Sequence, residues 1–170
     1  MPHVHPLSFD EAPEDAKPIL KAIQDKFGQS LNIFSTLAHQ PEVLGGVTQI
    51  NDGLQHDLPD KYRELAYYKA SQINSCDYCS HYHRQAAKKA GLTDKQLDSM
   101  DASDGELFTN EEQAVLRYAE QLTKTANIDA ETVAAVQGFL DEKQFVTLAS
   151  AVALANFTNR VNHGLGIELP

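Results

Sequence analysis

Residues 75–91 of the chain read SCDYCSHYHRQAAKKAG, the pattern of one amphipathic helix ended by its final glycine. At about 100° per residue, Cys76, Cys79 and His83 fall on one narrow stripe of this helix, which continues into small alanines. The opposite face is polar and consists of Asp77, His81, Gln85, Lys88 and Lys89. The stretch therefore predicts a helix over residues 75–90 whose two thiols and one imidazole face inward.

Helical spacing of apolar residues recurs along the rest of the chain, and no run alternates apolar and polar residues as a strand would. Proline, aspartate or threonine opens most of these segments, and glycine closes several of them. The further helices are expected over residues 13–28, 32–39, 41–53, 59–73, 109–124, 129–140 and 141–162, with a short turn over residues 93–100 and a flexible loop over residues 101–105. The sequence predicts an all-α fold, and its length suits a single domain over residues 1–170.

The last of these helices is apolar almost all the way round between residues 145 and 157. A helix of this kind is expected to be enclosed on every side. A central place in a helical bundle would enclose it, and so would an interface between subunits. We expect both.

The charge of the chain excludes some classes of partner. The sequence has 24 acidic and 14 basic residues, a net charge of −10, without a basic cluster. Nucleic-acid binding and attraction to anionic membranes both need concentrated lysine and arginine, so neither is expected. The first residues lack the pattern of a signal peptide, and no apolar run reaches the length of a membrane span. A cytoplasmic location is the resulting expectation.

The two cysteines are the only ones in the chain and lie three residues apart. In a reducing compartment, such a pair indicates redox chemistry or metal binding. A helix N-terminus lowers a thiol pKa, and the ring of His83, four residues beyond Cys79, can accept the thiol proton. Cys76 can then resolve a sulfenic acid formed on Cys79.

A zinc site, in a helical interaction module without catalysis, is the alternative interpretation of the same residues. Cys76, Cys79 and His83 offer three ligands of the type that zinc prefers, but a structural site needs a fourth. Without another cysteine, that ligand would have to be a distant histidine or carboxylate. Zinc sites usually show a second ligand pair at a recognisable spacing, so we favour redox chemistry and expect no bound metal.

These residues resemble the AhpD-like alkylhydroperoxidase family, within the carboxymuconolactone decarboxylase superfamily. The family pattern is a glutamate, eleven intervening residues, and then Cys-x-x-Cys-x-x-x-His, which Glu64, Cys76, Cys79 and His83 match. Residues 32–41 and 156–166 also resemble segments of the peroxidase-related branch. Superfamily members that act as decarboxylases lack the cysteine pair.

The resemblance implies a helical bundle with the cysteine pair at the N-terminal end of a core helix, assembled into dimers, trimers or hexamers. It implies thiol-dependent reduction of a small hydroperoxide, with electrons returned by a dithiol partner. Cys79 would be the attacking thiolate and Cys76 the resolving thiol, while Glu64 and His83 would form a proton relay. Apart from the redox-active Cys76–Cys79 disulfide, no cofactor is implied.

At two positions, Glu64 and Tyr78, the chain gives a different indication from the resemblance. On its own helix, Glu64 projects away from the aliphatic stripe, so periodicity predicts a solvated carboxylate. The best-characterised family members carry a histidine immediately before the second cysteine, where this chain has Tyr78. This departure motivates a second hypothesis, a thiol–disulfide oxidoreductase or redox sensor with weak peroxidase activity. The neighbouring tyrosines are expected to pack in the core with a hydrated hydroxyl.

Overall fold

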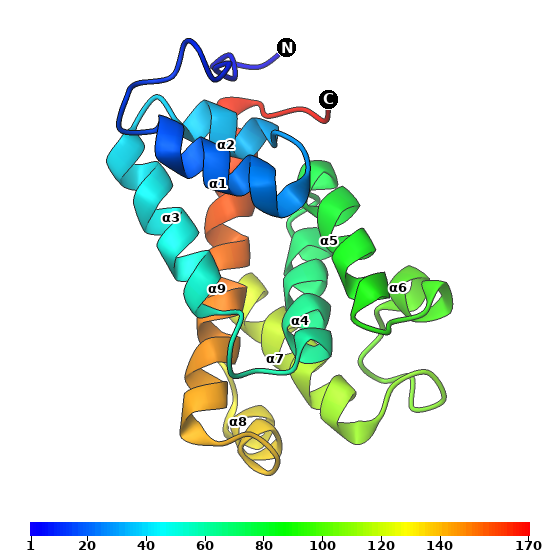
Figure 1. Ribbon diagram of the computed structural model, residues 1–170. Coiled ribbons are helices and arrows are strands. Elements are labelled where there is room, and N and C mark those ends of the chain that lie inside the picture. The colour runs from blue at the N-terminus through cyan, green and yellow to red at the C-terminus, as the bar shows by residue number, and fades with distance from the viewer. The chain divides into compact units, whose positions relative to one another are not determined.

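The structure is a computed structural model that describes all 170 residues, and it contains nine α-helices without strands (Figure 1). The predicted all-α fold class is therefore confirmed. The helices are α1 (Lys17–Phe27), α2 (Asn32–Leu37), α3 (Pro41–Gly53), α4 (Asp60–Ile73), α5 (Asp77–Lys89), α6 (Asp94–Ser99), α7 (Asn110–Thr125), α8 (Ala130–Gln137) and α9 (Glu142–Leu165). None of them combines the length and apolar character that crossing a membrane requires.

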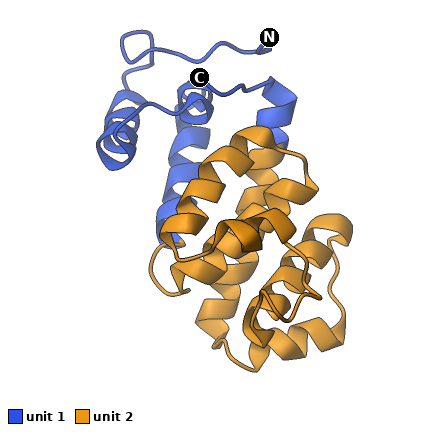
Figure 2. Cartoon of the chain, turned by 90° about the vertical axis from the view of Figure 1, so that its right-hand side faces the viewer, with its two compact units in different colours: residues 1–53, 160–170 blue, residues 54–159 orange.

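The chain divides into two compact units, shown in different colours in Figure 2. The first unit contains residues 1–53 and 160–170, and the second contains residues 54–159. The expectation of a single domain over residues 1–170 remains a prediction.

In the first unit, α2 packs against α3, and α1 ends where Gly28 adopts a left-handed φ of 72°. Glycine suits this position because a side chain would strain a left-handed residue. α1 starts at Lys17 and not, as expected, at Pro13. Near the chain ends, the N–H of His3 donates to the carbonyl of Leu165 at 2.9 Å.

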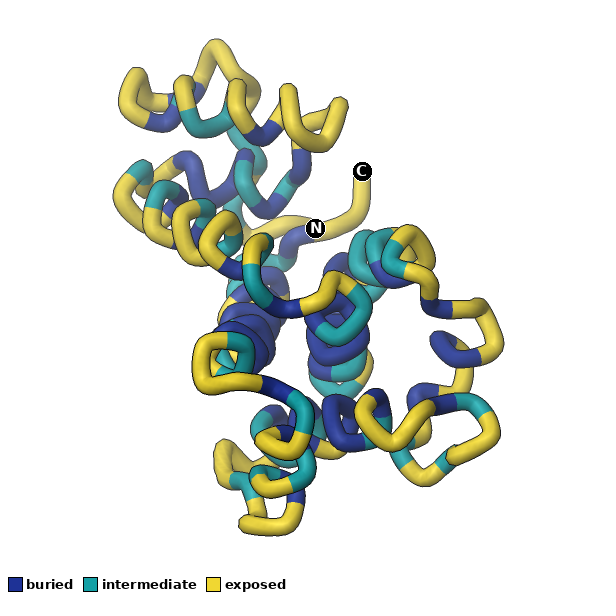
Figure 3. The backbone as a smooth tube through the Cα atoms, turned by 60° about the horizontal axis from the view of Figure 1, so that its bottom comes forward, coloured by how far each residue is buried: buried dark blue, intermediate teal, exposed yellow.

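In the second unit, α4 packs against both α5 and α7, and α7 packs against α8 (Figure 1). Thr93 and Thr109 begin α6 and α7 with capping boxes, in which the threonine and the third helical residue satisfy each other's backbone N–H. α4 is covered on most of its circumference. Its buried residues are Arg63, Glu64, Leu65, Ala66, Tyr67, Tyr68, Ala70 and Ser71. Figure 3 shows buried stretches along the helices and exposed residues in most of the turns.

The last helix was expected to be enclosed on every side, but within one chain only part of α9 is enclosed. Leu148, Ala151, Val152 and Ala155 of α9 are fully buried. Along the same helix, however, Val146 is 66% exposed, and Phe157, three turns further on, is 41% exposed. One apolar side of α9 is therefore open in the isolated chain.

Candidate active site

The cysteine pair begins at a tight turn between α4 and α5, over residues 74–76. Ser75 has a left-handed φ of 53°. The N–H of Cys76 donates to the carbonyl of Ser71 at 3.0 Å, and the N–H of Ser75 donates back into the last turn of α4 at 3.1 Å. This is a Schellman motif with serine where glycine is usual, a conformation that costs roughly 1–2 kcal/mol. The hydrogen bonds of the turn thus fix the backbone of Cys76 to the end of α4.

The side chain of Cys76 occupies the N-cap position of α5, and its Sγ accepts the N–H of Cys79 at 3.3 Å. A backbone N–H at a helix N-terminus stabilises negative charge, so this contact favours a thiolate on Cys76. Both thiols are buried, with 2% exposure for Cys76 and 4% for Cys79. The predicted inward orientation of the two thiols is therefore confirmed, although α5 begins at Asp77 and not at Ser75. The polar face is exposed as expected.

Glu64 is buried, with 7% exposure, and is not solvated as periodicity predicted. Its Oε2 is 2.8 Å from Nδ1 of His83, and its Oε1 accepts from Nε of Arg63 at 3.2 Å. Periodicity was wrong here because α5 packs against this side of α4 and brings an imidazole to the carboxylate. Burial alone would raise the pKa of Glu64, but His83 and Arg63 outweigh it and hold the pKa below its ordinary value. The carboxylate is therefore ionised at neutral pH.

Tyr67, one turn beyond Glu64 on α4, stacks on the ring of His83. The ring centroids are 3.6 Å apart and the planes differ by 14°. The Tyr67 hydroxyl lies 2.6 Å from Oγ of Thr158, which itself donates to a backbone carbonyl of α9. The single Thr158 proton is used in that bond, so Tyr67 is the donor. Burial raises the pKa of Tyr67, which remains a neutral phenol. The ring of His83 is thus held on one edge by Glu64 and on one face by Tyr67.

A row of hydrogen-bonded polar side chains attaches the turn at residues 74–76 to α9. The amide of Asn74 donates to Oδ1 of Asn159 at 2.8 Å and to Oδ1 of Asn156 at 3.0 Å. Asn159 in turn donates to Oγ of Ser71 at 3.2 Å. The sequence interpretation did not assign these residues a role. Polar residues within the apolar run of α9 were the signal available, because buried amides need hydrogen-bond partners.

The structure brings together Glu64 and His83 across two helices, and Cys76 and Cys79 at the start of α5. No group of three histidine, cysteine or carboxylate side chains in the structure is arranged to hold a metal ion. Tyr78, the departure from the family pattern, is buried, and its ring centroid lies 5.0 Å from that of Tyr82.

Comparisons with known proteins agree with this architecture. Residues 41–121 match the model of the carboxymuconolactone decarboxylase family. An uncharacterized protein of Bacillus subtilis, YdfG, is 29% identical over 107 residues, which are 61% of this chain and 73% of that protein.

Solved structures show the same fold. The AhpD core structure of an uncharacterized peroxidase-related protein from Ralstonia eutropha has a TM-score of 0.82 and 21% identity, over 96% of this chain and 89% of its own. The debrominase Bmp8 has a TM-score of 0.84 and 18% identity, over 98% of this chain and 91% of its own. At these identities the likeness establishes the AhpD-like helical fold.

Proposed function

We propose that the chain is an AhpD-like member of the carboxymuconolactone decarboxylase superfamily and that it is a thiol-dependent peroxidase. The thiolate of Cys79 attacks the terminal oxygen of a hydroperoxide, which breaks the O–O bond and leaves a sulfenic acid and an alkoxide that takes up a proton. The thiolate of Cys76 then displaces hydroxide, which leaves as water, and forms the disulfide. A dithiol partner reduces the disulfide and is itself oxidised.

The observation that carries the proposal is the 2.8 Å contact between Glu64 Oε2 and His83 Nδ1. An ionised carboxylate only accepts hydrogen bonds, so Nδ1 is the donor in this contact, and in the neutral ring Nε2 is the base. His83 is one helical turn beyond Cys79 on α5, within the reach of i,i+4 side chains. The ring can therefore take the Cys79 proton and return it to the leaving alcohol, while Glu64 stabilises the imidazolium.

The contact at Cys76 supports its role as the resolving residue. Resolution requires a thiolate on Cys76, and the N–H of Cys79 at 3.3 Å supplies local stabilisation of that charge. The four proposed residues differ in exposure. The side chain of His83 is 25% exposed, whereas both thiols are almost fully covered. We therefore propose that the hydroperoxide approaches the pair from the His83 side.

A comparison of serine variants tests the proposal. Reduced wild-type protein should consume hydroperoxide over many turnovers with dithiothreitol, and Cys79→Ser should fall to background. Cys76→Ser should react in the first step and accumulate a sulfenic acid that mass spectrometry detects. Full turnover by Cys79→Ser would refute the assignment. His81→Ala, on the exposed face of the same helix, is the matched control for His83→Ala.

The second candidate is a thiol–disulfide oxidoreductase, and Tyr78 is the observation that favours it. A neutral phenol in place of an imidazole removes one proton carrier beside Cys79, while the cysteine pair keeps its capacity for disulfide exchange. Measuring the reduction potential together with peroxide turnover separates the two functions. Fast disulfide exchange with a negligible peroxidase rate would favour the oxidoreductase.

We also propose that the protein forms a homo-oligomer in which a second copy covers the open side of α9. Val146 and Phe157 expose large apolar surface on a helix whose other side, at Leu148, Val152 and Ala155, is fully buried. Covering such a surface is favourable by about 25 cal/mol per Å² of apolar area. Sedimentation at several protein concentrations would test the assembly.

A further inference from the structure

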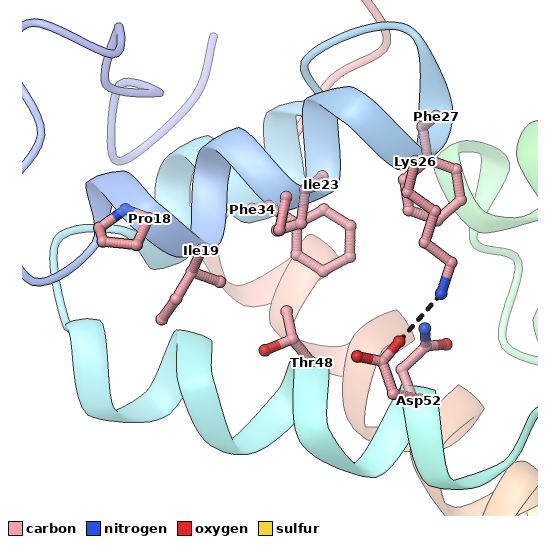
Figure 4. A pocket seen from close by; sticks show the side chains of 10 residues that line it. Pro18, Ile19, Ile23, Lys26, Phe27, Phe34, Thr48 and Asp52 are labelled. Carbon is pink, nitrogen blue, oxygen red and sulfur yellow. Dashed lines mark hydrogen bonds and ion pairs between the residues drawn. The ribbon is translucent and has the colours of Figure 1, made fainter.

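The first compact unit contains a pocket of about 320 Å³ between α1 and α3 (Figure 4). It lies within residues 18–52 and takes none of the residues of the proposed peroxidase site. Its side chains come from α1, from α3 and from Phe34 of α2. This volume is at the lower end of the range of about 300–1,000 Å³ typical of small-molecule sites.

The pocket exists because the residues of α1 and α3 bring the two helices close together at one of its ends and hold them further apart at the other. At one end, Gly45 has no side chain, and a Cβ placed there would lie 3.6 Å from Cδ1 of Ile19. At the other end, Nζ of Lys26 reaches Oδ1 of Asp52 at 2.9 Å, as the dashed line in Figure 4 shows. A lysine and an aspartate bridge a wider separation than a glycine and an isoleucine. The space between the two ends stays open.

The walls of the pocket are apolar. Ile19 and Ile23 come from α1, and Phe34 lies across from Thr48 (Figure 4). The hydroxyl of Thr48 donates to backbone carbonyls of its own helix at 3.0 Å, so it does not offer a hydrogen bond to a ligand. Phe27 and Phe34 are stacked with centroids 6.4 Å apart. Aromatic and branched side chains of this kind suit a flat ring.

The two charged side chains of the lining, Lys26 and Asp52, lie together at one end of the pocket, and Asn51 is a further polar residue of the lining. Lys26 engages Oδ1 of Asp52, which leaves Oδ2 as a hydrogen-bond acceptor at the mouth. The lysine and aspartate charges offset each other, and the protein carries a net charge of −10. An anionic ligand would therefore be disfavoured, while a neutral ligand with a donor group could reach Oδ2 of Asp52.

We propose that this pocket binds a neutral ring compound with one hydroxyl or N–H donor, with the ring between α1 and α3 and the donor on Asp52. A volume of about 320 Å³ corresponds to about ten water molecules at roughly 30 Å³ each. The ligand thus has about ten non-hydrogen atoms, the size of an alkylphenol or an indole. The site is independent of the thiol chemistry proposed above.

Isoleucine methyl NMR on the full-length protein tests this inference with 4-ethylphenol as the probe. Ile19 and Ile23 line the pocket, whereas Ile73 and Ile128 lie in the second unit and serve as internal references. We expect saturable shifts at Ile19 and Ile23. The methyl ether 4-ethylanisole, which lacks the donor, should bind about three- to tenfold more weakly.

Three variants separate this site from general apolar binding. Thr48→Phe fills the pocket and should abolish the shifts, whereas Gln49→Phe adds the same ring at the next, exposed position and should not. Asp52→Ala should remove the preference for the phenol over its ether. Binding that does not saturate, or that is equal in Asp52→Ala and wild type for both probes, would overturn the proposal. Because Asp52→Ala is judged on the ratio of the phenol and ether affinities within the variant, it decides the matter even where Thr48→Phe fails to fold.

Discussion

Replacing Glu64 by glutamine would keep the size of the side chain and remove the negative charge that His83 and Arg63 contact. Its Oε2 lies 2.8 Å from His83 and its side chain is only 9% exposed, so the hydrogen bond is charged and largely screened from water. Hydrogen bonds to charged groups contribute about 1.5–3 kcal/mol. If that energy is used to stabilise the imidazolium in the transition state, its loss slows the reaction roughly 10- to 150-fold at 1.36 kcal/mol per decade.

The assay is stopped-flow oxidation of the reduced protein by hydroperoxide, with the Cys79→Ser variant as the inactive reference. Glu111→Gln is the matched control, because Glu111 accepts the hydroxyl of Tyr62 at 2.7 Å on an exposed part of α7. That control should keep its rate within about twofold of wild type, since surface substitutions rarely change more than ~0.5 kcal/mol. A Glu64→Gln protein that reacts at the wild-type rate between pH 6 and 9 would refute the proton relay.

The same variant gives a prediction about stability. The fold lowers the pKa of Glu64 below its ordinary value of about 4.3, so the carboxylate stabilises the folded state above that pH. This contribution is lost as the pH falls through the lower folded pKa. The difference in melting temperature between wild type and Glu64→Gln should therefore be largest near pH 7 and shrink below about pH 4. A difference that stays constant down to pH 3 would contradict the assigned shift.

Three further substitutions test other parts of the structure. Tyr67→Leu removes the ring stacked on His83 and should lower the peroxide reaction rate about tenfold, whereas Tyr67→Phe keeps the ring and should lose mainly about 1 kcal/mol of stability with the Thr158 hydrogen bond. Equal rates for the leucine and phenylalanine variants would argue against a positioning role. Tyr78→His restores the histidine of the best-characterised relatives and should raise peroxide turnover at least severalfold, given that positioned acid–base groups contribute about 10²–10⁴-fold. Phe157→Glu places a charge on the open side of α9 and should lower the sedimentation mass without changing the helical content, and an unchanged mass would place any interface elsewhere.

Much of the fold was predictable because local patterns specify helices. Proline, threonine and glycine mark most helix ends, and the predicted bounds of α3 are those observed. The inward stripe of Cys76 and Cys79 was predictable for the same reason, since residues three apart on a helix share a face.

The prediction from periodicity was wrong at Glu64, because periodicity compares the polarity of the faces of a single helix and does not include the helices that pack against them. α5 and α7 both pack against α4, so even the polar side of α4 became interior. A buried carboxylate there requires partners, and the chain supplies Arg63 from the same helix and His83 from the next.

The sequence alone therefore specified an all-helical chain with two thiols and an imidazole on one stripe of α5. The tertiary packing added the carboxylate of Glu64, the stacked ring of Tyr67 and the amides that attach the turn to α9. These contacts join residues 16 to 91 positions apart, so no local periodicity encodes them. They form only when helices pack and each buried polar group must find a partner.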